Sequence, residues 1–287
     1  MTIPRVNVIG LLHPGEMGAA VGRSLTQAGH QVLWASEGRG EDTAARAVAA
    51  GLADVRTARR MTAEAEVIIS VCPPHAAVDV AWAVHGFAGL YLDANAIAPG
   101  TAREIAEMIT ASGGRYVDGG IIGPPPDKPG TTRLYLSGPE AGQAEDVFAG
   151  TALSTRIIAG PDTAASAVKM AYAAWTKGSA ALVLAARALA EAEGVADALL
   201  SEWELSQPQL AGRVEGAARS GVTKGWRWVG EMEEIAQTMA SAGLPDGFHL
   251  AAAEIYRRCP PLPGDTSGAD AARAVLAALT TADQTAG

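Results

Sequence analysis

The fold is decided by residues Pro161–Gly194, which read PDTAASAVKMAYAAWTKGSAALVLAARALAEAEG. The stretch opens with Pro-Asp, a helix start signal, and closes on a glycine, a helix stop signal. Because almost every residue between them is Ala, Leu, Val, Met or aromatic, it predicts one helix far longer than the ~11–12 residues of a mean helix. A helix this apolar must be covered by other elements or by a second chain. Its three cations, Lys169, Lys177 and Arg187, exclude a membrane span.

Upstream of this helix, short apolar runs alternate with helical segments, a pattern typical of a doubly wound parallel α/β sheet, the Rossmann fold. The expected strands are Val6–Gly10, Gln31–Ala35, Glu66–Val71, Gly89–Ala94, Arg115–Asp118, Thr132–Ser137 and Arg156–Ala159. The expected helices are one that ends near Gly29, His75–His85, Gly100–Ser112 and Gly138–Gly150.

Downstream of Pro161 the strand pattern ends and only helices are expected. They are the long helix itself and the segments Ala196–Leu205, Gln209–Arg219, Gly230–Ala242, Gly247–Arg258 and Ala269–Thr280. We therefore predict a Rossmann domain over residues 1–160. An all-helical domain follows over 161–287, joined by the long interdomain helix.

Length and composition narrow the function classes. A chain of 287 residues suits two domains. Its net charge of −9 disfavours nucleic acid and anionic membranes as partners. The two cysteines, Cys72 and Cys259, are too few for a disulfide framework, and no His/Cys/Asp spacing suggests a metal site. The first residues, MTIPRVNVIGLLHPG, lack the features of a signal peptide, so we expect a cytoplasmic protein.

A glycine-rich turn follows the first expected strand. The dinucleotide fingerprint G-x-G-x-x-G allows a tight turn and close approach of the backbone to a pyrophosphate at a helix N-terminus. Gly10, Gly15 and Gly18 match it, with three more residues between the first two glycines than the fingerprint has. In this enlarged loop, His13 and Pro14 either contact ribose or phosphate or are exposed. The segment expected to bind the cofactor also includes Leu12, Glu16 and Met17.

The residues after the second expected strand bear on the choice of cofactor. An acid there binds the ribose 2′-hydroxyl of NAD, whereas small polar residues and arginine suit the 2′-phosphate of NADP. Ser36 stands where the acid is expected, and Arg39 is in reach of a 2′-phosphate. Glu37, in contrast, is an acid that would favour NAD(H). We predict NADP(H) in preference to NAD(H).

Together these features resemble the β-hydroxyacid dehydrogenase superfamily, which includes 3-hydroxyisobutyrate dehydrogenase, tartronate semialdehyde reductase, the NAD-binding domain of 6-phosphogluconate dehydrogenase and imine reductases. The resemblance runs from Val6 to about Val195; beyond it, TKGWRWVGEMEEIA looks like a divergent branch with a distinct helical C-terminal domain. Val71, Cys72 and Pro73 are similar to the family's strand-ending LP motif, which packs against the cofactor. Asn95 takes the serine position of a D-x-S-T-x-x-P segment. The resemblance places it beside the nicotinamide; the alternative is an asparagine that satisfies a turn.

The family's substrate motif, D-A-P-V-S-G-G, is similar to the residues from Asp118 to Pro124. Asp118 and Gly123 are kept, but Ile122 replaces the serine that helps to hold a substrate carboxylate. The resemblance therefore implies a substrate larger or more apolar than a simple 3-hydroxy acid.

The last motif, K-x-x-N-N, aligns on Lys169 with both asparagines lost. The resemblance makes Lys169 the general acid and base, a task that suits a desolvated lysine; without that context it would be a lysine snorkelling to solvent. Tyr172, Ala173 and Thr176 share its helix face. Tyr172 either replaces the lost amide or is a core aromatic.

The aromatic residues of the helical domain allow two interpretations. Trp226 and Trp228 are either walls of the substrate cleft or core residues. The acids Glu231, Glu233 and Glu234 are expected in the first turn of a helix, with a second catalytic acid as the minority interpretation.

The predicted function is that of an NAD(P)-dependent oxidoreductase acting on CH–OH or C=O groups of a small molecule. In the superfamily such C-terminal helices dimerise, which implies a homodimer. Imine reduction is the alternative within the fold, and a catalytically inactive NADP(H)-binding regulatory protein is the alternative from another class.

Overall fold

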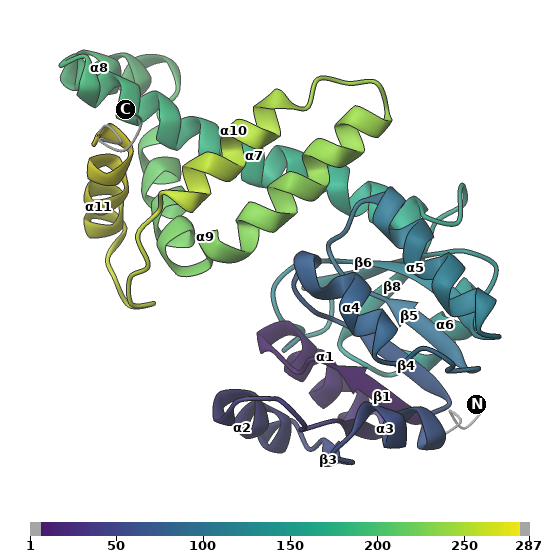
Figure 1. The fold of residues 1–287 in the computed structure, drawn as a ribbon. Coiled ribbons are helices and arrows are strands. Elements are labelled where there is room, and N and C mark those ends of the chain that lie inside the picture. Colours follow the sequence, from purple (N-terminus) through teal and green to yellow (C-terminus); the bar gives the residue numbers. More distant parts are fainter. Residues whose placement is uncertain (1–6, 282–287) are drawn as a thin grey trace. The chain divides into compact units, whose positions relative to one another are not determined.

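The computed structural model describes residues 7–281 and divides into two compact units, Met1–Met170 and Ala171–Gly287 (Figure 1). We call them the sheet unit and the helical unit. The division falls inside helix α7 (Ala164–Ala192), which runs on from one unit into the other. The boundary that the sequence suggests, between residues 160 and 161, lies before this helix and stays a prediction. The first residue of the first expected strand, Val6, lies outside the described residues.

The sheet unit is built on an eight-stranded sheet with the order β3-β2-β1-β4-β5-β6-β7-β8 in the described chain. Its strands are β1 (Val8–Leu12), β2 (Gln31–Trp34), β3 (Ala53–Asp54), β4 (Val67–Ser70), β5 (Leu90–Asp93), β6 (Arg115–Ile122), β7 (Thr132–Ser137) and β8 (Leu153–Ile157). Strands β1, β4 and β5 are almost fully buried apolar runs, as expected of parallel strands covered on both faces.

One strand departs from the predicted parallel arrangement. Strand β7 pairs antiparallel with β6, while all other neighbours in the sheet are parallel. The physical reason is the connection: residues 123–131 form a loop with no helix, and a parallel crossover needs a dozen or more residues. Strand β6 also extends beyond its expected end at Asp118, which brings two further glycines into the sheet.

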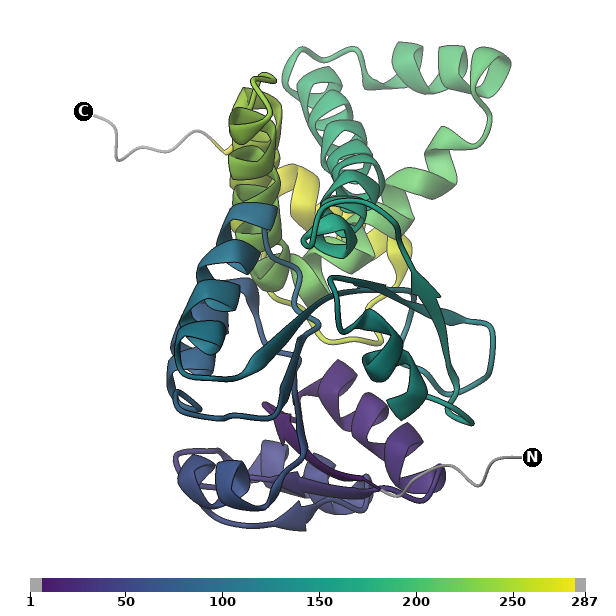
Figure 2. The same ribbon diagram turned by 90° about the vertical axis from the view of Figure 1, so that its right-hand side faces the viewer.

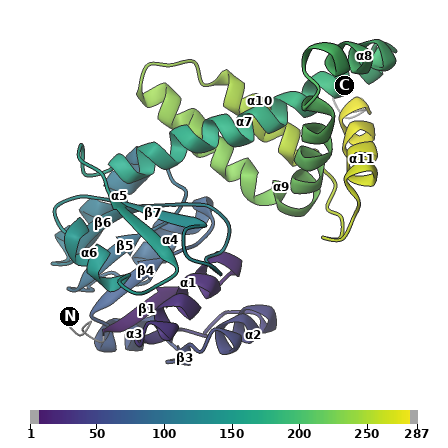
Figure 3. The ribbon, with the colours of Figure 1, turned by 180° about the vertical axis from the view of Figure 1, so that it is seen from behind.

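Helices cover both faces of the sheet. One face packs against α1 (Glu16–Gln27), α2 (Glu41–Ala49) and α6 (Ala141–Val147), and Figure 3 views the unit from this side. The other face packs against α3 (Ala58–Glu64), α4 (Ala77–Trp82) and α5 (Pro99–Ala111), with the short helix η1 (Pro74–Ala76) before α4. Elements α2, β3 and α3 have no counterpart among the expected elements. Helix α2 buries only Ala47, so its sequence carries little apolar periodicity.

The helical unit contains the rest of α7 together with α8 (Ala196–Ser206), α9 (Leu210–Ser241), α10 (Gly247–Arg257) and α11 (Gly268–Thr280). Helix α9 packs against both α10 and α11 (Figure 2). The prediction of two separate helices, Gln209–Arg219 and Gly230–Ala242, is wrong, because α9 runs on through the glycine-containing segment between them. Two of these glycines instead allow close packing: a Cβ on Gly221 would lie 2.9 Å from the Cys259 sulfur, and one on Gly225 3.2 Å from the Tyr256 carbonyl oxygen.

No helix within residues 7–281 combines the length and the apolar character needed to cross a bilayer.

Candidate cofactor and active site

The site of the sheet unit lies at the edge where its parallel strands end. Strand order reverses between β1 and β4, since β2 and β3 lie on one side of β1 and β4 to β6 on the other. Ligands of doubly wound sheets bind at the carboxyl ends of the strands, at such a switch point. Leu12 and Ser70 are register partners at the ends of β1 and β4. The segments that follow them, residues 13–18 and 71–73, therefore begin at the same edge.

The phosphate turn differs from its expected form. Gly10 lies inside β1, where a Cβ would meet the Met61 sulfur at 2.6 Å, so this glycine serves the packing of α3 on the sheet. The turn itself is His13-Pro14-Gly15-Glu16-Met17-Gly18, which has the normal G-x-G-x-x-G spacing with histidine at the first glycine. His13 adopts φ +63°, in the left-handed region that favours glycine. The predicted insertion is therefore wrong: the first glycine is replaced rather than displaced.

The turn is closed by contacts that leave no room for a side chain at Gly18. A Cβ on Gly18 would lie 2.6 Å from the His13 carbonyl oxygen, which accepts the Gly15 N–H at 2.7 Å. Gly15 is the N-cap of α1 and contributes no side-chain cap, so the helix N-terminus suits an anion. Glu16 is exposed, and Met17 packs against the core on the sheet face that α1, α2 and α6 cover. Arg46 of α2 donates to the Pro14 carbonyl oxygen at 3.4 Å.

A cavity of about 280 Å³ opens beside this turn. It is lined by the ends of β1 and by residues after β2, on α3 and on α4: Leu11, Leu12, His13, Ala35, Glu37, Arg39, Ala58, Met61, Asp79, Val80 and Ala83. Ser36, predicted to meet the ribose, is not among the lining residues. Its N–H is 3.2 Å from the Asp54 carboxylate, an acid that no sequence pattern singled out. Arg39 and Glu37 line the cavity together.

The segment after β4 is held by Asn95. The Asn95 side-chain oxygen accepts the Cys72 N–H at 2.6 Å, and its amide nitrogen donates to the Ser70 hydroxyl at 3.0 Å. Asn95 is buried, so these bonds tie the end of β4 to the turn after β5 and position Val71 and Pro73. The Asn95 side chain therefore bonds to the segment after β4 rather than to its own turn, where the Asp93 carboxylate accepts the Asn95 N–H at 2.9 Å; a cofactor contact of Asn95 stays a prediction. Burial raises the pKa of the Cys72 thiol to about 12, so it carries no nucleophilic chemistry near neutral pH.

Asp118 fastens the start of α7 to the sheet. Its fully buried carboxylate accepts the Ser166 N–H at 2.8 Å and the Ser166 hydroxyl, and the Ser137 hydroxyl at 3.0 Å. Ser137 in turn accepts the Ala165 N–H at 2.9 Å. Burial raises the pKa of the Asp118 carboxyl, while the hydrogen bonds from Ser166 and Ser137 oppose that rise. The carboxylate thus acts on the helix rather than on a substrate.

Lys169 follows directly on this fastened turn. A Cβ on Gly120 would lie 2.8 Å from the Ala165 carbonyl oxygen and 3.1 Å from the Lys169 Cβ, so only glycine lets α7 approach β6 this closely. Lys169 is half-buried, and within residues 7–170 its ammonium makes no hydrogen bond or ion pair. Ile122 is buried at the end of β6 and Gly123 follows with φ +131°.

The other predicted substrate residues belong to the helical unit. Tyr172 and Trp226 are exposed, at 47% and 65%, and Ala173 is buried. The Thr176 hydroxyl donates to the Tyr172 carbonyl oxygen. Because it is exposed, Trp226 is not a core residue; the Arg227 guanidinium lies 5.6 Å from the centre of its ring. Trp228, in contrast, contacts the Tyr256 ring edge-on.

Lys177 and Glu231 form an ion pair that sequence reasoning missed. The two side chains are only 16% and 12% exposed, and the Lys177 ammonium also lies 5.0 Å from the centre of the Trp228 ring. Tyr256 donates its hydroxyl to the Lys177 carbonyl oxygen at 2.6 Å. Glu231 lies in the middle of α9, so the prediction of an acidic first turn is wrong. Lys177 and Glu231 are 54 residues apart in the sequence, so no spacing rule predicts that they pair.

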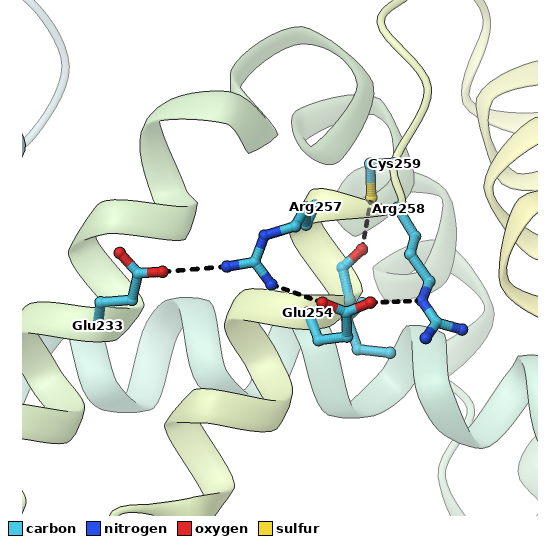
Figure 4. A network of polar contacts seen from close by, with 6 residues as sticks. Glu233, Glu254, Arg257, Arg258 and Cys259 are labelled. Atoms are coloured by element: carbon cyan, nitrogen blue, oxygen red, sulfur yellow. Dashed lines mark hydrogen bonds and ion pairs between the residues drawn. The ribbon is translucent and has the colours of Figure 1, made fainter. Parts of the chain in front are cut away.

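A second, exposed ionic network joins α9 to α10 (Figure 4). Arg257 bonds Glu233 at 3.0 Å and also Glu254, and Arg258 bonds Glu254 at 2.7 Å. Cys259, next in the chain, donates its thiol to a backbone carbonyl within α10's last turn. In the described part of the chain, no group of three His, Cys, Asp or Glu side chains is placed to hold a metal ion.

The sheet unit matches a known protein family. The profile of the NAD binding domain of 6-phosphogluconate dehydrogenase matches residues 5–151, more than half of the chain. The chain belongs to this family. A domain of unknown function matches residues 190–259, within the helical unit.

Solved structures share the fold over nearly the whole chain. A conserved hypothetical protein from Sinorhizobium meliloti 1021 is 21% identical, with a TM-score of 0.69 over 96% of both chains. The 3-hydroxyisobutyrate dehydrogenase of Mycobacterium tuberculosis is 22% identical, with a TM-score of 0.68 over 96% of this chain and 99% of that one. A reductive aminase from Aspergillus terreus, solved in complex with NADPH and ethyl-5-oxohexanoate, is 23% identical, with a TM-score of 0.56 over 89% of this chain and 94% of that one. At these identities the likeness concerns the fold, and it agrees with the predicted superfamily.

Proposed function

We propose that this protein is an NADP(H)-dependent oxidoreductase that transfers a hydride between the nicotinamide and a secondary alcohol or carbonyl carbon. Lys169 is its general acid and base. The observation that carries the proposal is the start of α7, where Asp118 and Gly120 fasten the helix to β6. Lys169 thus extends from a helix turn that is hydrogen-bonded to the sheet, and its ammonium has no partner within residues 7–170.

The sheet unit fits a nicotinamide dinucleotide on independent grounds. Gly18 lets the turn close tightly, because a Cβ there would lie 2.6 Å from the His13 carbonyl oxygen, and the uncapped N-terminus of α1 suits a pyrophosphate. In this proposal residues 13–18 hold the pyrophosphate, and Val71–Pro73 packs against the cofactor. When bound, the dinucleotide supplies or accepts the hydride. Arg39 in the cavity wall supports NADP(H), because its guanidinium matches a 2′-phosphate; Glu37 beside it would suit the hydroxyls of NAD(H).

Lys169 moves the proton that accompanies the hydride. During reduction its ammonium donates a proton to the substrate oxygen as the carbonyl carbon gains the hydride, which yields the alcohol. During oxidation the neutral amine accepts the hydroxyl proton as the hydride leaves. A fixed donor of this kind contributes a rate factor of ~10²–10⁴.

The substrate is proposed to be larger or more apolar than a simple 3-hydroxy acid. Ile122 replaces a serine and is buried, so it offers no hydroxyl to a carboxylate. From the helical unit, Tyr172, Thr176 and Trp226 are the proposed substrate contacts. Ala173 is buried and packs inside the protein.

The test is reduction of NADP⁺ or NAD⁺, followed by absorbance, with a panel of hydroxy acids, β-hydroxy amino acids, secondary alcohols and cyclic amines. Turnover of hydroxyl compounds that is lost in Lys169→Met, with cofactor binding intact, supports the proposal. Turnover of amines alone would overturn it in favour of imine reduction, the alternative within the same fold. Cofactor binding without turnover of any compound would favour the regulatory alternative.

We also propose a homodimer formed through the helical unit. The exposed residues Tyr172, Trp175, Leu182 and Leu189 of α7 follow each other at intervals of three and seven, so they form one apolar stripe along the helix. An exposed apolar stripe of this length suits a second copy of the same helix. Light scattering on a size-exclusion column tests this, with Leu182→Glu expected to shift the mass to that of the monomer. A monomeric wild-type protein would contradict it. The cytoplasm remains the proposed compartment.

A further inference from the structure

His13 occupies a position where the backbone favours glycine. It stands at the first glycine of the fingerprint and takes φ +63°, and among the described non-glycine residues only Arg56 shares a positive φ. A side chain retained in such a conformation points to a function, because glycine would serve the backbone better. The question is what the imidazole contributes.

The imidazole lies over the turn that the cofactor must approach. A Cβ on Gly15 would lie 3.5 Å from the His13 Nδ1 and 3.6 Å from Cε1, so the ring covers the second glycine of the fingerprint. His13 is half-buried and also lines the cavity that Arg39 lines. The ring therefore stands between the uncapped N-terminus of α1 and the cavity, where the adenosine side of a dinucleotide would bind.

Groups of both charge signs lie near His13, and those that lower its pKa are positive. Arg39 after β2, Arg46 on α2 and His75 in η1 all act on it, and Arg46 is anchored on the Pro14 carbonyl oxygen. The acids nearby are Glu37 and Asp79 in the cavity wall and the exposed Glu16 in the first turn of α1. Burial, and then Arg39, lower the pKa of His13 from its usual value, so the ring is neutral near pH 7 in the free protein. An anion bound among these cations would reverse this balance.

We propose that His13 is a cofactor-binding residue that takes up a proton when a phosphate of the dinucleotide binds, and pairs with that phosphate as an imidazolium. The inference rests on the proposed dinucleotide cofactor. The direction of the pH dependence follows from linkage. The bound state holds more protons, so the affinity for the cofactor falls as the pH rises through the range between the free and bound pKa values of His13. One linked proton changes the affinity by at most about tenfold per pH unit.

The experiment is titration calorimetry of the full chain with NADP⁺ and with NAD⁺ at pH 7, in buffers of different protonation enthalpy. The proteins are the wild type, His13→Gly and His13→Asn. Glycine and asparagine both accept a left-handed backbone, so these variants keep the turn. His85→Asn is the matched control, because His85 is exposed beyond α4 and distant in sequence from the turn.

We expect the wild type and His85→Asn to take up a larger fraction of a proton than the two His13 variants, whose affinity should also vary less between pH 6 and 8. An excess uptake with both cofactors assigns the contact to the pyrophosphate; an excess with NADP⁺ alone assigns it to the 2′-phosphate. The 2′-phosphate can itself take up a proton in every variant, so the difference between the wild type and His13→Gly is what reports on His13. Equal proton uptake in these two proteins would overturn the inference while leaving the cofactor proposal intact. Failure of the wild type to bind either cofactor would overturn both.

Discussion

Two lysines of the same helix meet opposite surroundings. Lys169, in the first turns of α7, is half-buried and has no partner for its ammonium within residues 7–170. Lys177, about two turns further on, is bound to Glu231 and lies over the Trp228 ring. The backbone around Lys169 is arranged by Asp118 and Gly120, so the protein positions that lysine without neutralising it. On this comparison we propose that the reactive lysine is the positioned one, whose ammonium has no partner in the sheet unit, and that burial alone does not mark a lysine as reactive.

The largest effect is expected from removing the unpaired lysine. Lys169→Met should lower kcat by about 10²–10⁴-fold, with the cofactor dissociation constant nearly unchanged, because the variant lacks only the proton donor. Lys169→Arg keeps the charge but holds its proton too tightly to release it, so it should be almost as slow. Steady-state kinetics and cofactor titration measure both. Full activity of Lys169→Arg would show that the cation acts by charge alone.

Lys177→Met should instead affect stability. It leaves Glu231 largely buried without its cation, which costs about 3–5 kcal/mol of unfolding free energy for a buried pair. Replacing both residues, as Lys177→Met with Glu231→Leu, should recover most of this loss, because no unpaired charge remains. Urea unfolding followed by circular dichroism measures both variants. If the double variant is as unstable as the single one, Lys177 stabilises the protein through contacts other than its ion pair with Glu231.

Gly120→Ala tests the positioning of Lys169 without touching its ammonium. The added methyl would lie 2.8 Å from the Ala165 carbonyl oxygen, so α7 must shift away from β6. We expect a loss of about 1–3 kcal/mol in stability, as for other overpacked sites, and a lower kcat at unchanged cofactor affinity. Gly142→Ala on α6 is the matched control, since its Cβ would meet nothing within 4 Å. Equal behaviour of the two variants would refute the close approach.

The smallest effect is expected in the network of Figure 4. Glu254 bonds Arg257 and Arg258 with side chains that are about half exposed. Glu254→Gln should therefore cost less than about 1 kcal/mol of unfolding free energy, and less still in high salt. A loss as large as that of Lys177→Met would mean that exposure is a poor guide to the strength of ion pairs in this protein.

The features that could be predicted from the sequence are those with strong local patterns. The strands β1, β4 and β5 bury most of a continuous apolar segment, and the long α7 is an uninterrupted run of mostly apolar residues, so composition alone indicates them. Helix α2 buries a single residue and gives no such signal. Strand β7 is antiparallel because no crossover helix follows Gly123. Predicting each strand separately does not take the length of the connections into account, so it misses this direction.

The site shows the same limit. The turn after β1 could be recognised from Gly15 and Gly18, but its register depends on His13 adopting a glycine-like φ, which is a property of the backbone. The hydrogen bonds of Asn95 and the partner of Lys177 join residues far apart in the sequence, so no spacing rule reports them.

The fastening of α7 also decides how the protein can be cut into pieces. A fragment that stops at Gly160 lacks Ala165 and Ser166, so the Asp118 carboxylate would lose both bonds from Ser166. Ser137 would lose the N–H that it accepts from Ala165. A fragment that continues to Met170 retains these partners and the first turns of the helix. The working boundary for separate expression of the nucleotide-binding part therefore lies inside α7, where no change in composition marks it.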